Sequence, residues 1–235
     1  MNFKLLATIS ALSFVDAINV CALAVLTMIL VTILIQNPDK RKKTLYAGLM
    51  FSLAVFIMYF VYGTLIYTLF KKVAEGIQGA SPIVYNIFIV LILIVGALNI
   101  KDYFYYKKGG FATEMPLFLR PKVKKIINKI TSPSGAFITG LAVTIFLLPC
   151  TMMPLVTAMQ KLSFLGYNFI QSVPWILIYN LIFVAPMIII TIIIYLGFAR
   201  VEDVSNWKER NIRKLHLIAG ILLFLVGLGL LFGII

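Results

Sequence analysis

The sequence predicts an all-α membrane protein with six transmembrane helices arranged as two inverted-topology repeats of three helices each. Of its 235 residues, 62% are hydrophobic and only 12% are charged. The mean hydropathy of +1.03 is typical of a polytopic membrane protein and far from that of a soluble domain. Long apolar segments also alternate with short basic connections, and this alternation sets the expected number of helices.

Six apolar segments are long enough to cross a hydrocarbon core of roughly 30 Å, which requires about 20 helical residues. We place them at residues 3–35, 45–70, 82–100, 135–160, 169–198 and 215–235. The first segment would be about 50 Å long as one straight helix, so we expect it to tilt or to break. Its apolar run continues past Cys21 to Ile35, which argues against a cleaved secretory signal.

The distribution of basic residues predicts the orientation. All of the 21 Lys and Arg residues except Lys4, Lys71, Lys72 and Lys161 lie in the connections after the first, third and fifth segments. By the positive-inside rule, these three connections face the cytoplasm of a cell membrane and both termini face outside. The formal charge of +13 therefore reflects topology and not a nucleic-acid surface.

Three spans, a long basic connection and three more spans give two halves of opposite orientation, as in an inverted repeat. We expect a first repeat at residues 1–107, a cytoplasmic linker at 108–134 and a second repeat at 135–235. Residues 21–26 also resemble residues 150–155. A two-fold axis in the membrane plane would bring Cys21 and Cys150 to a similar depth and make them candidates for one disulfide.

Cys150 lies between Pro149 and Pro154 within the fourth apolar segment. Because proline lacks a backbone N–H and clashes with the preceding turn, we expect the helix to break at Pro149. Cys150 would then begin a half-helix whose free N–H groups favour a thiolate. The first segment should break near Cys21, where Asp16 and Asn19 interrupt the apolar run.

Two cysteines can hold two electrons as a thiol pair and release them by forming a disulfide, through exchange with a partner's cysteine. The alternative is that both are small buried apolar residues, as free cysteines usually are. Two cysteines and one histidine are too few for a zinc site or an iron–sulfur cluster.

The residues Asn19, Val20 and Cys21, together with Pro149, Cys150, Thr151 and Pro154, resemble the paired cysteine motifs of the CcdA family, which is similar to the membrane domain of DsbD. The resemblance implies a membrane electron transporter in which Cys21 and Cys150 are the catalytic pair. It would pass reducing equivalents from cytoplasmic thioredoxin to extracytoplasmic thioredoxin-like proteins, in cytochrome c maturation, without an organic cofactor or a metal. Val20 departs from the family's proline, so Asp16 and Asn19 would hold the break open instead.

Several other polar residues and prolines lie in the apolar segments, and some of them allow two interpretations. Asp16 is either a functional intramembrane carboxylate or a residue at the outer interface. Pro174 and Pro186 are hinges or packing kinks of the fifth segment, and Asn99 and Asn180 bond across helices.

Two regions outside the spans have simpler expectations. His216 should be interfacial, and the amphipathic stretch 122–129 should lie on the inner leaflet. Two further functional classes stay open: a small solute or ion transporter with broken helices and incidental cysteines, and a purely structural membrane subunit.

Overall fold

The computed structural model describes residues 3–18, 20–36, 41–76, 80–106, 120–127, 132–197 and 201–232, and these contain helices but no strand. The helices are α1 (Phe3–Ala17), α2 (Val20–Gln36), α3 (Arg41–Gly76), α4 (Ala80–Phe104), α5 (Arg120–Ile127), α6 (Pro133–Phe164), α7 (Phe169–Tyr195) and α8 (Val201–Leu231). Four are long and apolar enough to cross a membrane, with spans at Lys42–Lys72, Asn86–Phe104, Phe169–Tyr195 and Glu209–Leu231. The prediction of an all-helical membrane protein is therefore confirmed for the part of the chain described here.

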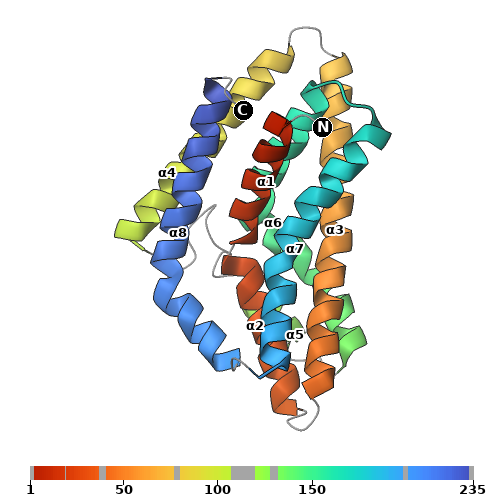
Figure 1. Cartoon of the computed structure of the whole chain (residues 1–235), viewed down its shortest axis with the longest axis vertical. Helices are drawn as coiled ribbons and strands as arrows, with labels where there is room; N and C mark the ends of the chain where they lie inside the picture. Colours follow the sequence, from red (N-terminus) through yellow and green to blue (C-terminus); the bar gives the residue numbers. More distant parts are fainter. Residues whose placement is uncertain are drawn as a thin grey trace.

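The first apolar segment is broken, as expected. α1 ends at Ala17 and α2 begins at Val20, so the interruption falls beside Asp16. The Ile18 amide still donates a hydrogen bond to the Phe14 carbonyl, 3.2 Å away, and closes the last turn of α1. Figure 1 shows α1 and α2 following one another along the long axis of the bundle.

The expected break at Pro149 is wrong, because α6 runs without interruption from Pro133 to Phe164. A proline inside a helix removes only its own N–H bond and displaces the carbonyl one turn earlier. Such a defect is tolerated within a membrane helix where neighbouring helices, hydroxyl side chains or small adjustments of the backbone satisfy the freed carbonyl again. The helix starts where local chemistry favours a start: Pro133 is in its first turn, and the Ser132 hydroxyl accepts from the Gly135 amide at 3.2 Å.

Two of the basic connections contain more helix than expected. α8 begins at Val201, well before the expected span at 215, because the charged stretch is rich in good helix formers. α5 has the amphipathic pattern that the sequence predicts, with Lys122, Lys124 and Lys125 exposed. Its Val123 and Ile127 are buried in the protein core, so its apolar face packs on the bundle and not on the inner leaflet.

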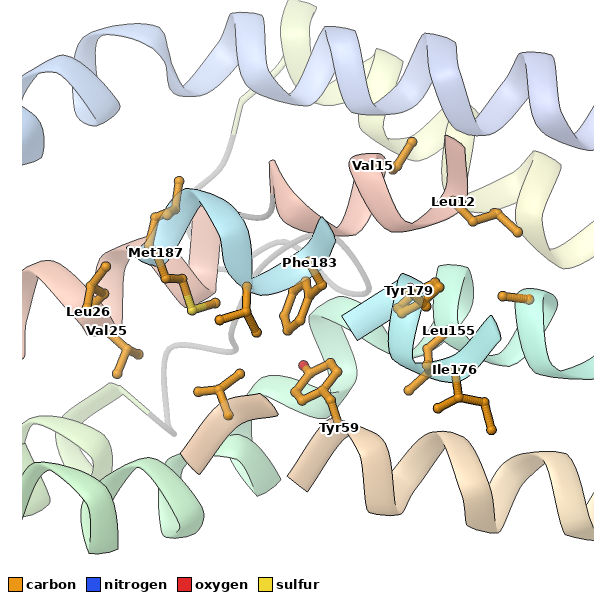
Figure 2. Close-up of a cluster of buried hydrophobic side chains, with 14 of the residues drawn as sticks. Leu12, Val15, Val25, Leu26, Tyr59, Leu155, Ile176, Tyr179, Phe183 and Met187 are labelled. Atoms are coloured by element: carbon orange, nitrogen blue, oxygen red, sulfur yellow. The ribbon is translucent and has the colours of Figure 1, made fainter. Parts of the chain in front are cut away.

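Four helices form a closed ring around the main core. α1 packs against α6 and α7, and α3 also packs against α6 and α7. We call this arrangement of α1, α6, α3 and α7 the four-helix ring. Figure 2 shows side chains from all four helices meeting inside it, among them Leu12, Tyr59, Leu155 and Phe183. α4 and α8 pack against each other as a pair beside the ring (Figure 1).

Glycines allow these helices to approach closely. A Cβ atom at Gly140 of α6 would lie 2.7 Å from the Ala54 Cβ of α3, and one at Gly48 of α3 would lie 2.4 Å from Thr191 Cγ2 of α7. At the crossing of α4 and α8, a Cβ at Gly220 would lie 2.8 Å from the Gly96 carbonyl oxygen. Small residues at contact faces are typical of packed membrane helices, because apolar lipid supplies no hydrophobic drive for association.

The helices alternate in direction along the bundle. The start of α1 and the end of α8 lie at the same end, whereas α3, α6 and α8 begin at the opposite end (Figure 1). The connections that follow α2 and α7 are therefore attached toward the end of the bundle away from the start of α1, whereas α4 ends about halfway along the long axis (Figure 1).

The crossing of α4 and α8 gives a direct test of this packing. Gly220→Ala should destabilise the protein by about 1–3 kcal/mol, because its Cβ would meet backbone atoms of Gly96 and Ile100 that cannot move independently. The midpoint of thermal unfolding in detergent measures this. Ile221→Ala, at an exposed position on the same turn, is the matched control and should change the midpoint far less. Equal midpoints for the two variants would contradict the close crossing.

Candidate functional site

Four polar side chains are buried inside the bundle, and three of them lie near the middle of the candidate spans of α3 and α7, where a membrane protein normally has apolar residues. They are Asp16 at the end of α1, Tyr59 on α3, and Tyr179 and Asn180 on α7, and none is more than 1% exposed. We call these four residues the midspan polar cluster. Polar groups at this depth are costly unless they bond to one another or serve a function.

A hydrogen bond between side chains joins α1 to α7 inside this cluster. The Tyr179 hydroxyl donates to Asp16 Oδ2 over 2.9 Å, and both residues are buried. The Ser13 hydroxyl, one turn earlier on α1, donates to the Tyr179 backbone carbonyl. Asp16 therefore lies inside the bundle, and its placement at the outer interface is wrong. Its functional role stays a prediction.

Tyr59 places an aromatic surface beside this bond. Its ring stacks on Phe183 of α7, with ring centroids 4.4 Å apart and planes 27° apart (Figure 2). The cluster thus combines hydroxyl groups, a carboxyl group and aromatic ring faces within the contact between α1, α3 and α7.

Asn180 differs from the rest of the cluster. Its side chain is fully buried, yet neither Oδ1 nor Nδ2 has a hydrogen-bond partner within the described structure. It lies on the same stripe of α7 as Ile176, which packs on Gly63 of α3, and Phe183. The expected bond from Asn180 across helices is therefore wrong, and a buried carboxamide without partners normally costs about 1–3 kcal/mol.

Asn99 on α4 provides a useful contrast, because its expected bond across helices is confirmed. Its Oδ1 lies 2.9 Å from His216 Nδ1 of α8, and its Nδ2 donates to the Val95 carbonyl over 2.9 Å. His216 is only 3% exposed, so its expected interfacial position is wrong. The histidine is held inside by this bond and by the ring of Tyr106, 5.8 Å away.

A second group of polar side chains lies toward the end of α6 near the start of α1. Burial of its side chain, and secondarily the positive charge of Lys4, lowers the pKa of Lys161, which follows the expected span 135–160. On the same part of α6, Gln160 Nε2 and Ser163 Oγ are buried with no hydrogen-bond partner in the described ranges. This end of the ring is therefore rich in hydrogen-bond donors and carries positive charge.

The structure does not decide the predicted cysteine site. Cys21 and Cys150 belong to α2 and α6, but their side chains lie outside the described residues, as do Asn19 and the side chains of Val20, Pro149 and Thr151. Of the remaining predicted residues, Pro154 is buried, Pro174 is exposed and Pro186 is half-buried. α7 is continuous through Pro174 and Pro186, and their role as hinges stays a prediction.

Sequence reasoning singled out Asp16 but missed its partner. Tyr179 lies in a long apolar run, where an aromatic residue is usually interpreted as core, and nothing local marks it as a donor to a carboxyl 163 residues away. In the described segments, no three His, Cys, Asp or Glu side chains gather to hold a metal ion.

Comparison with known protein families changes the functional interpretation. Residues 9–234 match the model of a family described as SfLAP: Sap, sulfolipid-1-addressing protein. Comparisons with curated proteins and with solved structures gave no match. The family match covers almost the whole chain, whereas the resemblance to CcdA rested on the two cysteine motifs and on the expected number and orientation of the spans.

The resemblance to the CcdA family is therefore wrong, and the electron transport inferred from it is overturned as well. Thiol–disulfide exchange with thioredoxin and with thioredoxin-like acceptors, and a place in cytochrome c maturation, lose their basis. The apolar helices and the family match agree on a multi-pass membrane protein. The chain belongs to the SfLAP family, the family of the sulfolipid-1-addressing protein Sap.

Proposed function

We propose that this protein is a lipid carrier, which binds the headgroup of an amphiphilic lipid inside its helix bundle and moves the lipid across the cell membrane. The family name refers to the addressing of a sulfolipid, and a lipid is a substrate that reaches such a protein from within the bilayer. The observation that carries the proposal is the midspan polar cluster, which is buried in an otherwise apolar four-helix ring.

A polar headgroup needs hydrogen-bonding partners at the centre of the membrane. Crossing the hydrocarbon core without them costs several kcal/mol for each unsatisfied polar group. Asp16, Tyr59, Tyr179 and Asn180 supply donors and acceptors at the depth where the barrier is highest. A membrane subunit with a purely structural role would have no need for such a costly arrangement.

The break between α1 and α2 supports movement at the same place. Interrupted helices in transporters free backbone groups at a binding site and allow one part of a bundle to move against another. The Tyr179–Asp16 bond fixes the end of α1 against α7. Breaking and remaking this bond would let α1 shift while the headgroup is exchanged between the two sides.

The packing also supports two related halves, residues 1–107 and 135–235, joined by the linker 108–134. In the two halves, α1 corresponds to α6 and α3 corresponds to α7. α1 packs against α7, and α6 packs against α3. If the two halves are exchanged, the contact α1–α7 becomes the contact α6–α3, and the contact α4–α8 is unchanged. In this arrangement the basic connections face the cytoplasm and both termini face outside.

The carrier proposal predicts that Tyr179→Phe slows lipid movement at least tenfold, because the hydrogen bond from Tyr179 to the Asp16 carboxyl is lost. The protein would be reconstituted in phosphatidylcholine vesicles that contain a nitrobenzoxadiazole-labelled sulfated glycolipid. Dithionite bleaches only the label in the outer leaflet, so the slow loss of protected label measures transfer between leaflets. Tyr195→Phe, on the same helix, is the matched control. A folded Tyr179→Phe protein with the wild-type rate, or a wild-type protein with no transfer, would overturn the proposal.

The cysteines provide an independent prediction. A Cys21→Ser/Cys150→Ser double variant should move the labelled lipid within about twofold of the wild-type rate, because a carrier that works by hydrogen bonding requires no dithiol. The same vesicle measurement, made in the presence and absence of a reducing agent, checks this. Loss of transfer in the double variant, with an unchanged unfolding midpoint, would show that the sulfur atoms matter for function.

A further inference from the structure

We infer that Asn180 is the centre of a binding site for an uncharged, hydroxyl-bearing part of the lipid headgroup. This inference rests on the proposed function and deepens it, since it specifies which chemistry the middle of the ring accepts. It starts from a single fact: a fully buried carboxamide on α7 has two polar atoms without partners in the described structure.

The two unpartnered atoms define the ligand. Oδ1 requires a donor and Nδ2 requires an acceptor. A metal or ammonium cation could satisfy only Oδ1, and an anionic oxygen could satisfy only Nδ2. A hydroxyl group can both donate and accept, so two neighbouring hydroxyls of a polyol can donate to Oδ1 and accept from Nδ2 of the same carboxamide.

The surrounding charges also favour a neutral group. α7 contains no Lys or Arg, and α3 contains none between Lys43 and Lys71. The carboxyl group in the cluster is that of Asp16, which already acts as an acceptor for Tyr179. An acidic group placed beside Asn180 would therefore have no counter-charge in a medium of low dielectric constant. The acidic part of a lipid would remain near the end of the ring where Lys4 and Lys161 lie.

The rings of Tyr59 and Phe183 favour a ring-shaped ligand beside Asn180. Ile176 and Phe183 lie one turn before and about one turn after Asn180 on the same face of α7, and Phe183 stacks on Tyr59. A ring-shaped polyol has apolar C–H faces and a polar edge, so it can rest on aromatic faces while its edge bonds to the carboxamide. A small anionic group would gain nothing from these ring faces, because the face of an aromatic ring carries partial negative charge.

Asn99 serves as the internal standard for this inference. Both asparagines are buried in helices, but both side-chain atoms of Asn99 are bonded. Asn99→Leu should therefore lower the unfolding midpoint, because it removes the hydrogen bond between Asn99 and His216. Asn180→Leu should leave the midpoint unchanged or raise it, because it removes two unsatisfied groups.

The site is tested by the fluorescence of Trp175, which is buried on α7 close to Asn180. Because the chain has two tryptophans, Trp207→Phe leaves Trp175 as the single reporter. This protein, in phosphatidylcholine nanodiscs, would be titrated with octyl glucoside, octyl sulfate and octyl trimethylammonium, which share a tail and differ in headgroup. We expect a saturable change with octyl glucoside alone. Asn180→Leu should weaken its binding at least tenfold, and Asn99→Leu should leave its affinity within about twofold of the unsubstituted reporter protein.

Two outcomes would overturn the site. If Asn180→Leu binds octyl glucoside as tightly as the unsubstituted reporter protein, Asn180 does no more than hold a buried water molecule. If octyl sulfate binds equally well, the site is not selective for neutral groups. Either result leaves the transfer of labelled lipid between leaflets untouched, so failure of this site and failure of the carrier proposal can be told apart.

Discussion

The hydrogen bond between Tyr179 and Asp16 is the contact on which the arrangement of the ring depends. The bond joins α7 to the end of α1, and α1 packs against α6 and α7 as α3 does on the other side of the ring. The break that follows Ala17 deprives this end of the support that a continuous helix would give. In a medium of low dielectric constant a carboxyl group and a phenol form a strong hydrogen bond. Burying either group without a partner would lower the stability of the protein. The position of α1 is thus set by a polar contact within an apolar core.

Much of the fold could be predicted from the sequence, because membrane helices have a strong compositional signal. Apolar runs located the long helices, and Asp16 located the interruption in the first of them, since a carboxylate within such a run is informative on its own. Pro149 was misleading for a physical reason. A proline removes one hydrogen bond of many, and packing by α3 along the length of α6 keeps the helix whole. Local chemistry identifies the weak point, but tertiary contacts decide whether it breaks.

The candidate site was harder to predict from the sequence, because its main contacts join residues that are far apart in the chain. Tyr179 and Asn180 lie in an apolar run of α7 with no charged neighbour, and only the fold brings Tyr179 to Asp16 and Tyr59 to Phe183. The cysteine motifs misled for a related reason. Prolines and small residues near a helix interruption occur wherever membrane helices are broken, so two short segments indicate a scaffold more reliably than a chemistry.

Asn99 and Asn180 show how a structure separates stabilising polar groups from functional ones. Asn99 is bonded at both ends and joins α4 to α8, so its polarity is explained by packing alone. Asn180 has the same side chain and similar burial but gains no bond from the folded chain. A leucine at that position would fill nearly the same volume without an unsatisfied group. A residue that lowers stability where an apolar one would fit is a candidate for a functional role. In the proposed lipid carrier, that role is to bind the part of the headgroup that is hardest to bring through the membrane.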